Sequence, residues 1–152
     1  MIYDFKKYDE VKKFFTDSCH LHNPCEVMLF HDQRDTVQKM LTEIAQETGR
    51  TLIDKDLSTL LPNELGSMTL DRTLPDWLSP VLKDKDGKGY IIYLREYHVA
   101  PLKVQTDVLN VLIKKNFEGV DFPKNTLIVL GARKEDEVAE GLTHTHVVKF
   151  YK

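Results

Sequence analysis

Short runs of apolar residues recur along the chain, separated by longer segments of mixed character. The run EVMLFH at Glu26–His31 is almost continuously apolar, which is typical of a strand buried on both faces. Four further runs of five or six residues share this character. The pattern therefore predicts five buried strands, at residues 26–31, 50–54, 90–94, 125–130 and 146–151.

Amphipathic segments lie between these runs. Thr36–Thr48 has apolar residues at the i, i+3, i+4, i+7 and i+8 spacing of one helix face, and Gly49 follows it as a stop. Comparable spacing, or a proline in the first turn, predicts further helices at residues 8–18, 75–82 and 101–115. A short helix is expected within residues 57–67, ending near Pro62.

Apolar strands that alternate with helices are typical of a parallel sheet covered on both sides. The sequence therefore predicts an α/β fold: a three-layer α/β/α domain, similar to that of P-loop NTPases, with a five-stranded, mainly parallel sheet. Since the chain has 152 residues and no linker or repeat, we expect one domain over residues 1–152. Residues 1–22 are expected to form an N-terminal helix and loop.

Composition narrows the range of functions. The formal net charge is −3, and the basic residues are scattered among acidic ones, which argues against nucleic acid as a direct partner. No apolar run approaches the length of a membrane span, and the charged N-terminus does not resemble a signal peptide. With two cysteines, Cys19 and Cys25, whose spacing matches no common zinc site, we expect a cytoplasmic protein without a metal or cofactor.

Ligands of parallel α/β sheets bind at the carboxyl ends of the strands. The residues that follow each predicted strand are therefore expected to meet at one edge of the sheet. These residues are His31-Asp32, Asp54, Arg95-Glu96 and Ala132-Arg133.

The order of these elements resembles the core of an AAA+ ATPase, in particular the MoxR-like and related helix-inserted group. The segment EVMLFHDQRDTVQKMLTEIAQETGRTLI is similar to the strand, phosphate loop, helix and second strand of that family. The segment DWLSPVLKDKDGKGYIIYLREYHVAPLKVQTDVLNVLI is similar to the part that carries the Walker B strand, and FPKNTLIVLGARKEDE to the strand that ends in the polar sensor residue. The resemblance covers residues from about Asn23 onward and implies the AAA+ fold.

The positions that bind phosphate in the family carry other residue types here. Aligned without a gap, the phosphate loop corresponds to HDQRDTVQ and contains no glycine, although glycines let backbone N–H groups wrap the phosphates. Val37 stands at the Lys position and Gln38 at the Ser/Thr position. The loop positions thus comprise His31, Asp32, Gln33, Arg34, Asp35, Thr36, Val37 and Gln38.

The remaining catalytic positions are also altered. Arg95 replaces the Walker B Asp and cannot bind magnesium, whereas Glu96 matches the Glu that activates water. The sensor Asn falls near Ala132 and Arg133, and no segment matching the lid domain follows the last predicted strand. The resemblance therefore implies a site that has lost its catalytic residues, and we expect no ATP hydrolysis.

Two alternatives concern these substituted positions. We expect Arg95 to form a salt bridge with Asp32, Asp35 or Glu96, rather than to recruit an anion together with Arg34 and Arg133.

Two histidine arrangements are possible as well. Glu96 and His98 would form an acid–base pair if they converged, but a histidine in a surface loop is the simpler interpretation of His98. His144 and His146 alternate in THTH and would make a metal pair only with a further ligand.

These observations predict a non-catalytic, AAA+-like protein-binding module, or pseudo-ATPase. By analogy with the edge-to-edge assembly of AAA+ proteins, it would act as an adaptor, cap or inhibitor of an active AAA+ or replication complex, or associate with itself. Such a small module would suit a phage or another mobile element. The alternatives are a domain that binds nucleotide or an anion without hydrolysis, and a small hydrolase that uses Glu96 and His98.

Overall fold

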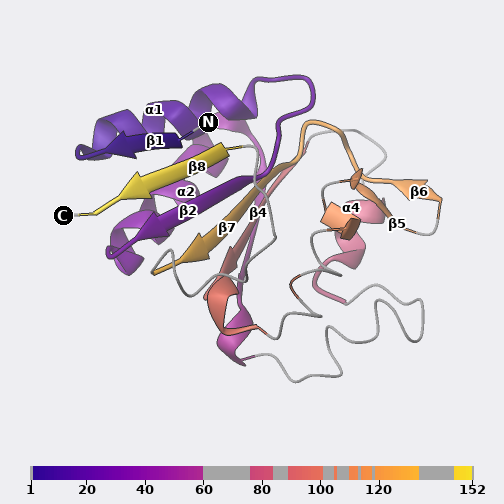
Figure 1. The fold of residues 1–152 in the computed structure, drawn as a ribbon. Coiled ribbons are helices and arrows are strands. Elements are labelled where there is room, and N and C mark those ends of the chain that lie inside the picture. The colour runs from indigo at the N-terminus through magenta and orange to yellow at the C-terminus, as the bar shows by residue number, and fades with distance from the viewer. Residues whose placement is uncertain are drawn as a thin grey trace.

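The centre of the molecule is a six-stranded sheet in which every neighbouring pair of strands is parallel. The computed structural model describes residues 2–59, 76–83, 89–100, 105, 110–112, 114–117, 119–133 and 146–151. Figure 1 shows the strands side by side, with the N-terminus at the start of β1 and the C-terminus just past the end of β8, at opposite ends of these two parallel strands. Their spatial order is β1 (Ile2–Phe5), β8 (His146–Phe150), β2 (Val27–His31), β7 (Leu127–Ala132), β4 (Tyr90–Arg95) and β3 (Thr51–Asp56).

Two long helices, α1 (Tyr8–Cys19) and α2 (Arg34–Thr48), cover one face of the sheet together (Figure 1). Helix α2 ends at Gly49, whose φ of 70° is the left-handed conformation that glycine adopts without strain. The other described elements are the 3₁₀ helices η1 (Leu57–Thr59) and η2 (Tyr97–Val99), the helix α4 (Ser79–Lys83), and a hairpin of β5 (Asn116–Phe117) and β6 (Val120–Asp121).

The sheet is buried on both faces, as its apolar strands predicted. In β2, Val27 and Leu29 pack with α1 and α2, whereas Met28 and Phe30 belong to the core on the opposite face. All five residues of β2 and all six of β7 are buried. This arrangement directs the carboxyl ends of β2, β7, β4 and β3 to a common edge.

The predicted fold class is confirmed, with one correction to the sheet. The sequence predicted five strands, and the structure has six, because β1 pairs in parallel with β8. The N-terminal segment, expected to be a helix and a loop, therefore begins with a strand. Only four residues long and alternately exposed, β1 lacks the continuous apolar run by which the other strands were recognised. The β5–β6 hairpin was not predicted either.

The predicted helices agree where they are described. The segment predicted at residues 8–18 is α1, and that at 36–48 is α2, which begins two residues earlier at Arg34. Within residues 75–82, the described helix α4 spans Ser79–Lys83. Most of the helix predicted at 101–115 lies outside the described residues, as do all of residues 60–67 of the segment in which a short helix was expected.

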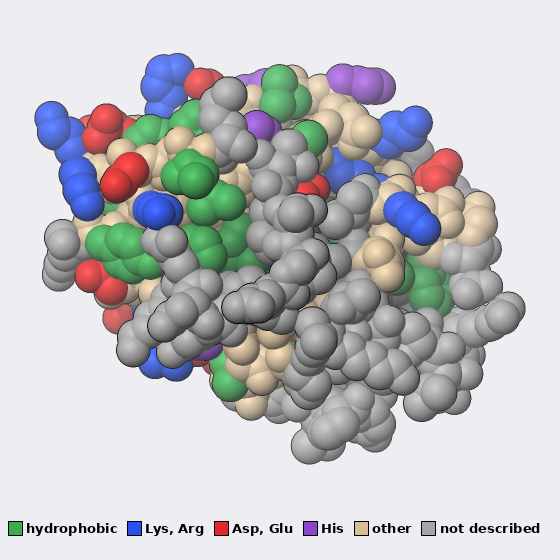
Figure 2. Space-filling view, viewed as in Figure 1, with side chains coloured by type: hydrophobic (Ala, Val, Ile, Leu, Met, Phe, Trp, Pro, Cys, Tyr) green, Lys and Arg blue, Asp and Glu red, His purple; other side chains and the backbone are tan. Residues whose placement is uncertain are grey.

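The described residues include neither a membrane-spanning helix nor a metal-binding cluster. None of the described helices is long and apolar enough to cross a membrane. Within the described part of the chain, no group of three or more His, Cys, Asp or Glu residues could hold a metal ion. On the face drawn in Figure 2, Lys and Arg side chains lie interspersed with Asp and Glu.

Candidate functional site

The connection between β2 and α2 is too short to be a phosphate loop. Strand β2 ends at His31 and α2 begins at Arg34, so the connection consists of Asp32 and Gln33. Of the positions aligned with the family's phosphate loop, residues 34–38 form the first turns of α2, which begins two residues before the predicted start at Thr36. Asp35 lies in the first turn of this helix, where a carboxylate suits the helix dipole. A two-residue connection offers too few backbone N–H groups to wrap a phosphate.

The side chain of His31 fills the space beside this connection. It is buried, and its Nδ1 accepts a hydrogen bond from the backbone N–H of Gln33 at 3.2 Å. A neutral imidazole then carries its proton on Nε2, which lies 3.3 Å from the Tyr93 hydroxyl. Nε2 therefore donates and the tyrosine oxygen accepts. Burial lowers the pKa of His31 to about 4, so the imidazole is neutral at pH 7.

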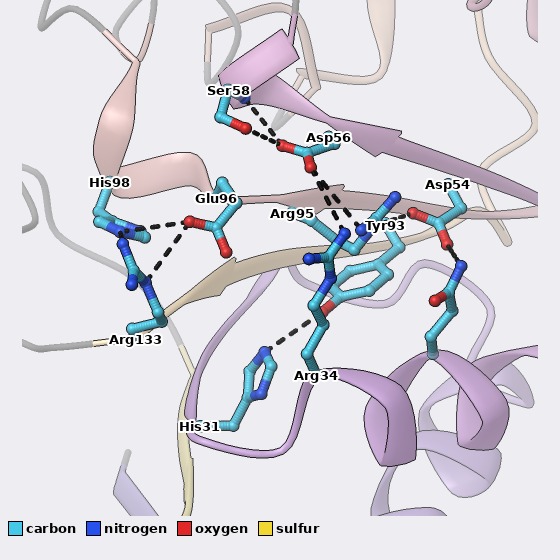
Figure 3. Close-up of polar contacts among 11 residues, drawn as sticks. His31, Arg34, Asp54, Asp56, Ser58, Tyr93, Arg95, Glu96, His98 and Arg133 are labelled. Atoms are coloured by element: carbon cyan, nitrogen blue, oxygen red, sulfur yellow. Dashed lines mark hydrogen bonds and ion pairs between the residues drawn. The ribbon is translucent and has the colours of Figure 1, made fainter.

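Arg95, at the Walker B position, is held by the neighbouring strand β3. Its Nε donates to Asp54 Oδ1 at 2.6 Å, and its Nη1 lies 3.8 Å from Asp56 Oδ2 (Figure 3). Gln38 of α2 donates to the other oxygen of Asp54 at 2.9 Å. The expected salt bridge is therefore present, but these carboxylates come from β3 rather than from Asp32, Asp35 or Glu96.

The carboxylate of Asp56, the second acidic partner of Arg95, contacts several further groups. Ser58 donates to Asp56 Oδ1 through its backbone N–H at 2.9 Å and its hydroxyl at 2.6 Å, while Arg34 lies 3.9 Å from Oδ2. Burial alone would raise the pKa of Asp56, but the Ser58 hydrogen bonds and the two arginines lower it. Burial likewise opposes the charge of Arg95, yet the hydrogen bond to Asp54 and the nearby carboxylates raise its pKa. Both groups are therefore fixed in their charged forms.

Glu96, which the resemblance sets at the position of the Glu that activates water, lies in a second cluster. It follows β4 in the left-handed conformation, with φ 55° and ψ 37°, a strained geometry for a residue other than glycine. Its Oε2 is 3.5 Å from Arg133 Nε and 3.6 Å from His98 Nε2 (Figure 3). Arg133 Nη2 is 3.3 Å from the same nitrogen of His98. Because arginine only donates, His98 Nε2 accepts this hydrogen bond in the neutral tautomer.

The interpretation of His98 as a surface-loop residue is wrong. Its side chain is only 5% exposed, because η2 turns the chain back toward β7 directly after Glu96. Glu96 and His98 therefore do lie close together, although strand β4 ends before either of them. His144 lies outside the described residues, so its pairing with His146 stays a prediction.

A cavity of about 530 Å³ opens beside the second cluster. Asp32 contributes to it from the β2–α2 connection and Arg34 from the start of α2, while Glu96 and Arg133 directly follow β4 and β7. Val37, at the family's Lys position, is instead fully buried in the core against α1 and the sheet. Residues at the ends of the strands do converge, as the sequence predicted. The described lining is His31, Asp32, Arg34, Glu96, Arg133 and Tyr151.

Sequence reasoning missed four participants in this site: Tyr93, Asp56, Ser58 and Tyr151. The Tyr151 hydroxyl donates to the backbone oxygen of Arg133 at 3.3 Å. Asp56 would have been found if the strand predicted at 50–54 had been extended by two residues. Tyr93 carried no comparable signal, since an aromatic residue within an apolar run is ordinarily part of the core.

Comparisons with known proteins bear on the fold. No family model matches the sequence, and no curated protein matches it either. Thirty-one solved chains match the structure, among them a P216G mutant of RuvB from Thermotoga maritima, with a TM-score of 0.62 and 13% sequence identity. That match covers 95% of this chain and 46% of the RuvB chain.

The fold is AAA+-like. The architecture that this chain shares with RuvB extends over nearly its whole length. At this low identity the likeness concerns the fold alone. This chain spans less than half of the RuvB chain that it matches.

Proposed function

We propose that this protein is a pseudo-ATPase: an AAA+-like domain of the MoxR-like or helix-inserted type that binds a protein partner and does not hydrolyse ATP. Its role would be that of an adaptor, cap or inhibitor of an active AAA+ or replication assembly, or of a self-associating subunit. A phage or another mobile element would be a fitting source. The single observation that carries the proposal is the two-residue connection between β2 and α2.

Further support comes from what occupies the altered site. A catalytic AAA+ site needs a Lys for the β- and γ-phosphates and a carboxylate on magnesium. Here Val37 is buried in the core, and Arg95 is paired with Asp54. Restoring the magnesium site would require breaking that pair, so single-residue reversion is not expected to recover activity.

Nucleotide calorimetry and an ATPase assay test the proposal directly. We expect no ATP or ADP binding tighter than about 1 mM and no hydrolysis above the buffer rate, with an active RuvB as positive control. Micromolar ATP binding that Arg95→Ala abolishes would overturn the proposal. The partner role is tested by adding the protein to active AAA+ ATPases and measuring their turnover, which should change for the true partner.

The geometry of Glu96 and His98 favours a second candidate, a small hydrolase. Their side chains are 3.6 Å apart beside a cavity large enough for a small substrate. However, the contact of Arg133 with both groups would neutralise the carboxylate that a general base requires. Screening ester and phosphoester substrates with Glu96→Gln as control distinguishes the two candidates, since only a hydrolase would lose turnover in that variant.

An anion-binding role without hydrolysis is the remaining alternative. Arg34 and Arg133 line the cavity, and their side chains are 65% and 63% exposed. Asp32 and Glu96 line it as well, so its formal charge is balanced and anion affinity is expected to be weak. Phosphate titration of the wild type against Arg133→Gln would detect such binding.

A further inference from the structure

A second, smaller cavity lies at the opposite end of the sheet from the candidate site. It has a volume of about 270 Å³ and lies between β1, the beginning of β8 and the last turns of α1. Neither the AAA+-like site nor the proposed function makes use of it. Its lining combines aromatic rings with a carboxylate, which is the combination that recognises organic cations.

Three aromatic rings pack together along this cavity. The ring centroids of Tyr3 and Phe14 are 4.7 Å apart, and His146 lies 6.0 Å from Tyr3 and 6.2 Å from Phe14. The planes are tilted by 50° to 81° rather than stacked flat. All three residues also line the cavity, so they offer it a continuous aromatic wall.

The charge on the lining is negative. Asp17, near the end of α1, contributes a carboxylate, and the described lining contains no Lys or Arg. Lys13 contacts Asp17 at 2.8 Å, but both side chains of this pair are largely exposed, and such pairs are weakly held. The carboxylate can therefore still accept hydrogen bonds from a ligand.

His146 contributes its ring to the lining of this cavity. Its Nδ1 is shielded from solvent, so this atom does not face the open cavity. The Asp17 carboxylate is therefore the acceptor that the described lining offers to a ligand.

We propose that this cavity binds a guanidinium group, presented by an arginine side chain of a protein partner. The planar group stacks on the Tyr3–Phe14 wall while its N–H donors reach the Asp17 carboxylate. A quaternary ammonium would share the aromatic contact but could not donate to that carboxylate. The arginine's origin in a partner rests on the proposed binding role, whereas the guanidinium chemistry is tested without any partner.

The experiment titrates methylguanidinium into the full chain and follows backbone amide shifts by NMR. We expect saturable millimolar binding, with the largest shifts at Asp17–Leu21 and His146. Asp17→Asn should weaken it about tenfold, the effect of losing a charge-assisted hydrogen bond. Asp9→Asn, an exposed change at the other end of α1, is the matched control and should leave the affinity unchanged.

Two further measurements separate the contribution of the aromatic contact to binding from that of hydrogen bonding. Phe14→Leu keeps an apolar side chain but removes an aromatic face, and should weaken binding about threefold. Tetramethylammonium should bind at least about tenfold more weakly than methylguanidinium. Equal affinities for Asp17→Asn and Asp9→Asn, or equal affinities for the two cations, would overturn the proposal. Neither result would affect the pseudo-ATPase proposal, which depends on the other end of the sheet.

Discussion

The two ends of the sheet use positive charge in different ways. At the carboxyl end, Arg95 and Arg133 pair with the carboxylates of Asp54 and Glu96. At the amino end, two cations, Lys115 and Arg50, instead donate to uncharged oxygens. The buried Lys115 donates to Asn23 Oδ1 and the backbone oxygen of Pro24, each at 2.9 Å, and to that of Lys124 at 2.7 Å.

Arg50 acts in the same way at the amino end. It donates to the backbone oxygen of Cys19, at the end of α1, and to that of Thr48, at the end of α2, the latter at 3.3 Å. These carbonyl groups have no partner within their helices. The amino end is therefore held together by cations that complete backbone hydrogen bonding, whereas the carboxyl end holds a balanced set of charges around a cavity.

The largest expected effect is at Lys115. Replacing it with Met leaves three acceptors without their donor in a buried position, and we expect the free energy of unfolding to fall by about 4 kcal/mol. Lys114→Met, a change at the exposed neighbouring residue, should alter it by less than about 0.5 kcal/mol. Urea denaturation of both variants measures the difference, and similar midpoints would contradict this view of the amino end.

The second largest loss of stability is expected for a substitution of Arg95. Arg95→Met leaves Asp54 and Asp56 facing each other without their main cation, at a site where the three side chains are 15% to 16% exposed. We expect a loss of about 3 kcal/mol, and a smaller loss when Asp54→Asn is added. Arg34→Met should cost less than about 0.5 kcal/mol because its side chain is mostly exposed. If Arg34→Met lowered the free energy of unfolding more than Arg95→Met, Arg34 rather than Arg95 would be the main partner of these carboxylates.

The neutral His31 predicts a pH dependence. Burial lowers its pKa to about 4 from the ordinary histidine value of 6.5, so between these values the unfolded chain binds a proton that the native protein does not. The resulting stability is fully present above pH 6.5 and is lost as the pH falls toward 4. We expect a loss of about 2 kcal/mol between pH 7.5 and 5. Denaturation at several pH values should give a flatter curve for His31→Gln than for the wild type.

Alanine substitutions at two glycines, Gly131 and Gly49, should have the smallest effects on stability. A Cβ at Gly131 would lie 2.9 Å from the Tyr93 ring, so Gly131→Ala should displace the ring from His31 and cost about 2 kcal/mol. At Gly49, a Cβ meets nothing within 4 Å, and only the positive φ opposes Ala, at about 1 kcal/mol. Thermal denaturation measures both changes, and the Tyr93 NMR signals should shift only in Gly131→Ala.

The continuous apolar runs predicted the strands, and the order of strands and helices predicted the parallel sheet. They also predicted correctly that residues after β2, β4 and β7 would meet. What the sequence did not reveal is how neighbouring strands align. Arg95 pairs with Asp56 because these residues are opposite each other in the β3–β4 register, and a parallel register depends on packing of the whole sheet rather than on local pattern.

The backbone conformation at two positions could not be predicted from the sequence either. The early start of α2 at Arg34 depends on Asp32 and Gln33 making a tight connection, although HDQRDTVQ has the length of a phosphate loop. The left-handed Glu96 turns the chain so that His98 becomes buried. Glutamate rarely adopts this conformation, and no residue type near it indicated a turn.

The pairing of β1 with β8 bears on how the chain assembles. Strand β8 lies between β1 and β2, although it is the last described strand along the chain. During synthesis from the N-terminus, β1 has no neighbour until residues 146–150 have left the ribosome. Such distant pairings slow folding, so this edge of the sheet should form last and should be the first to acquire deuterium in hydrogen exchange.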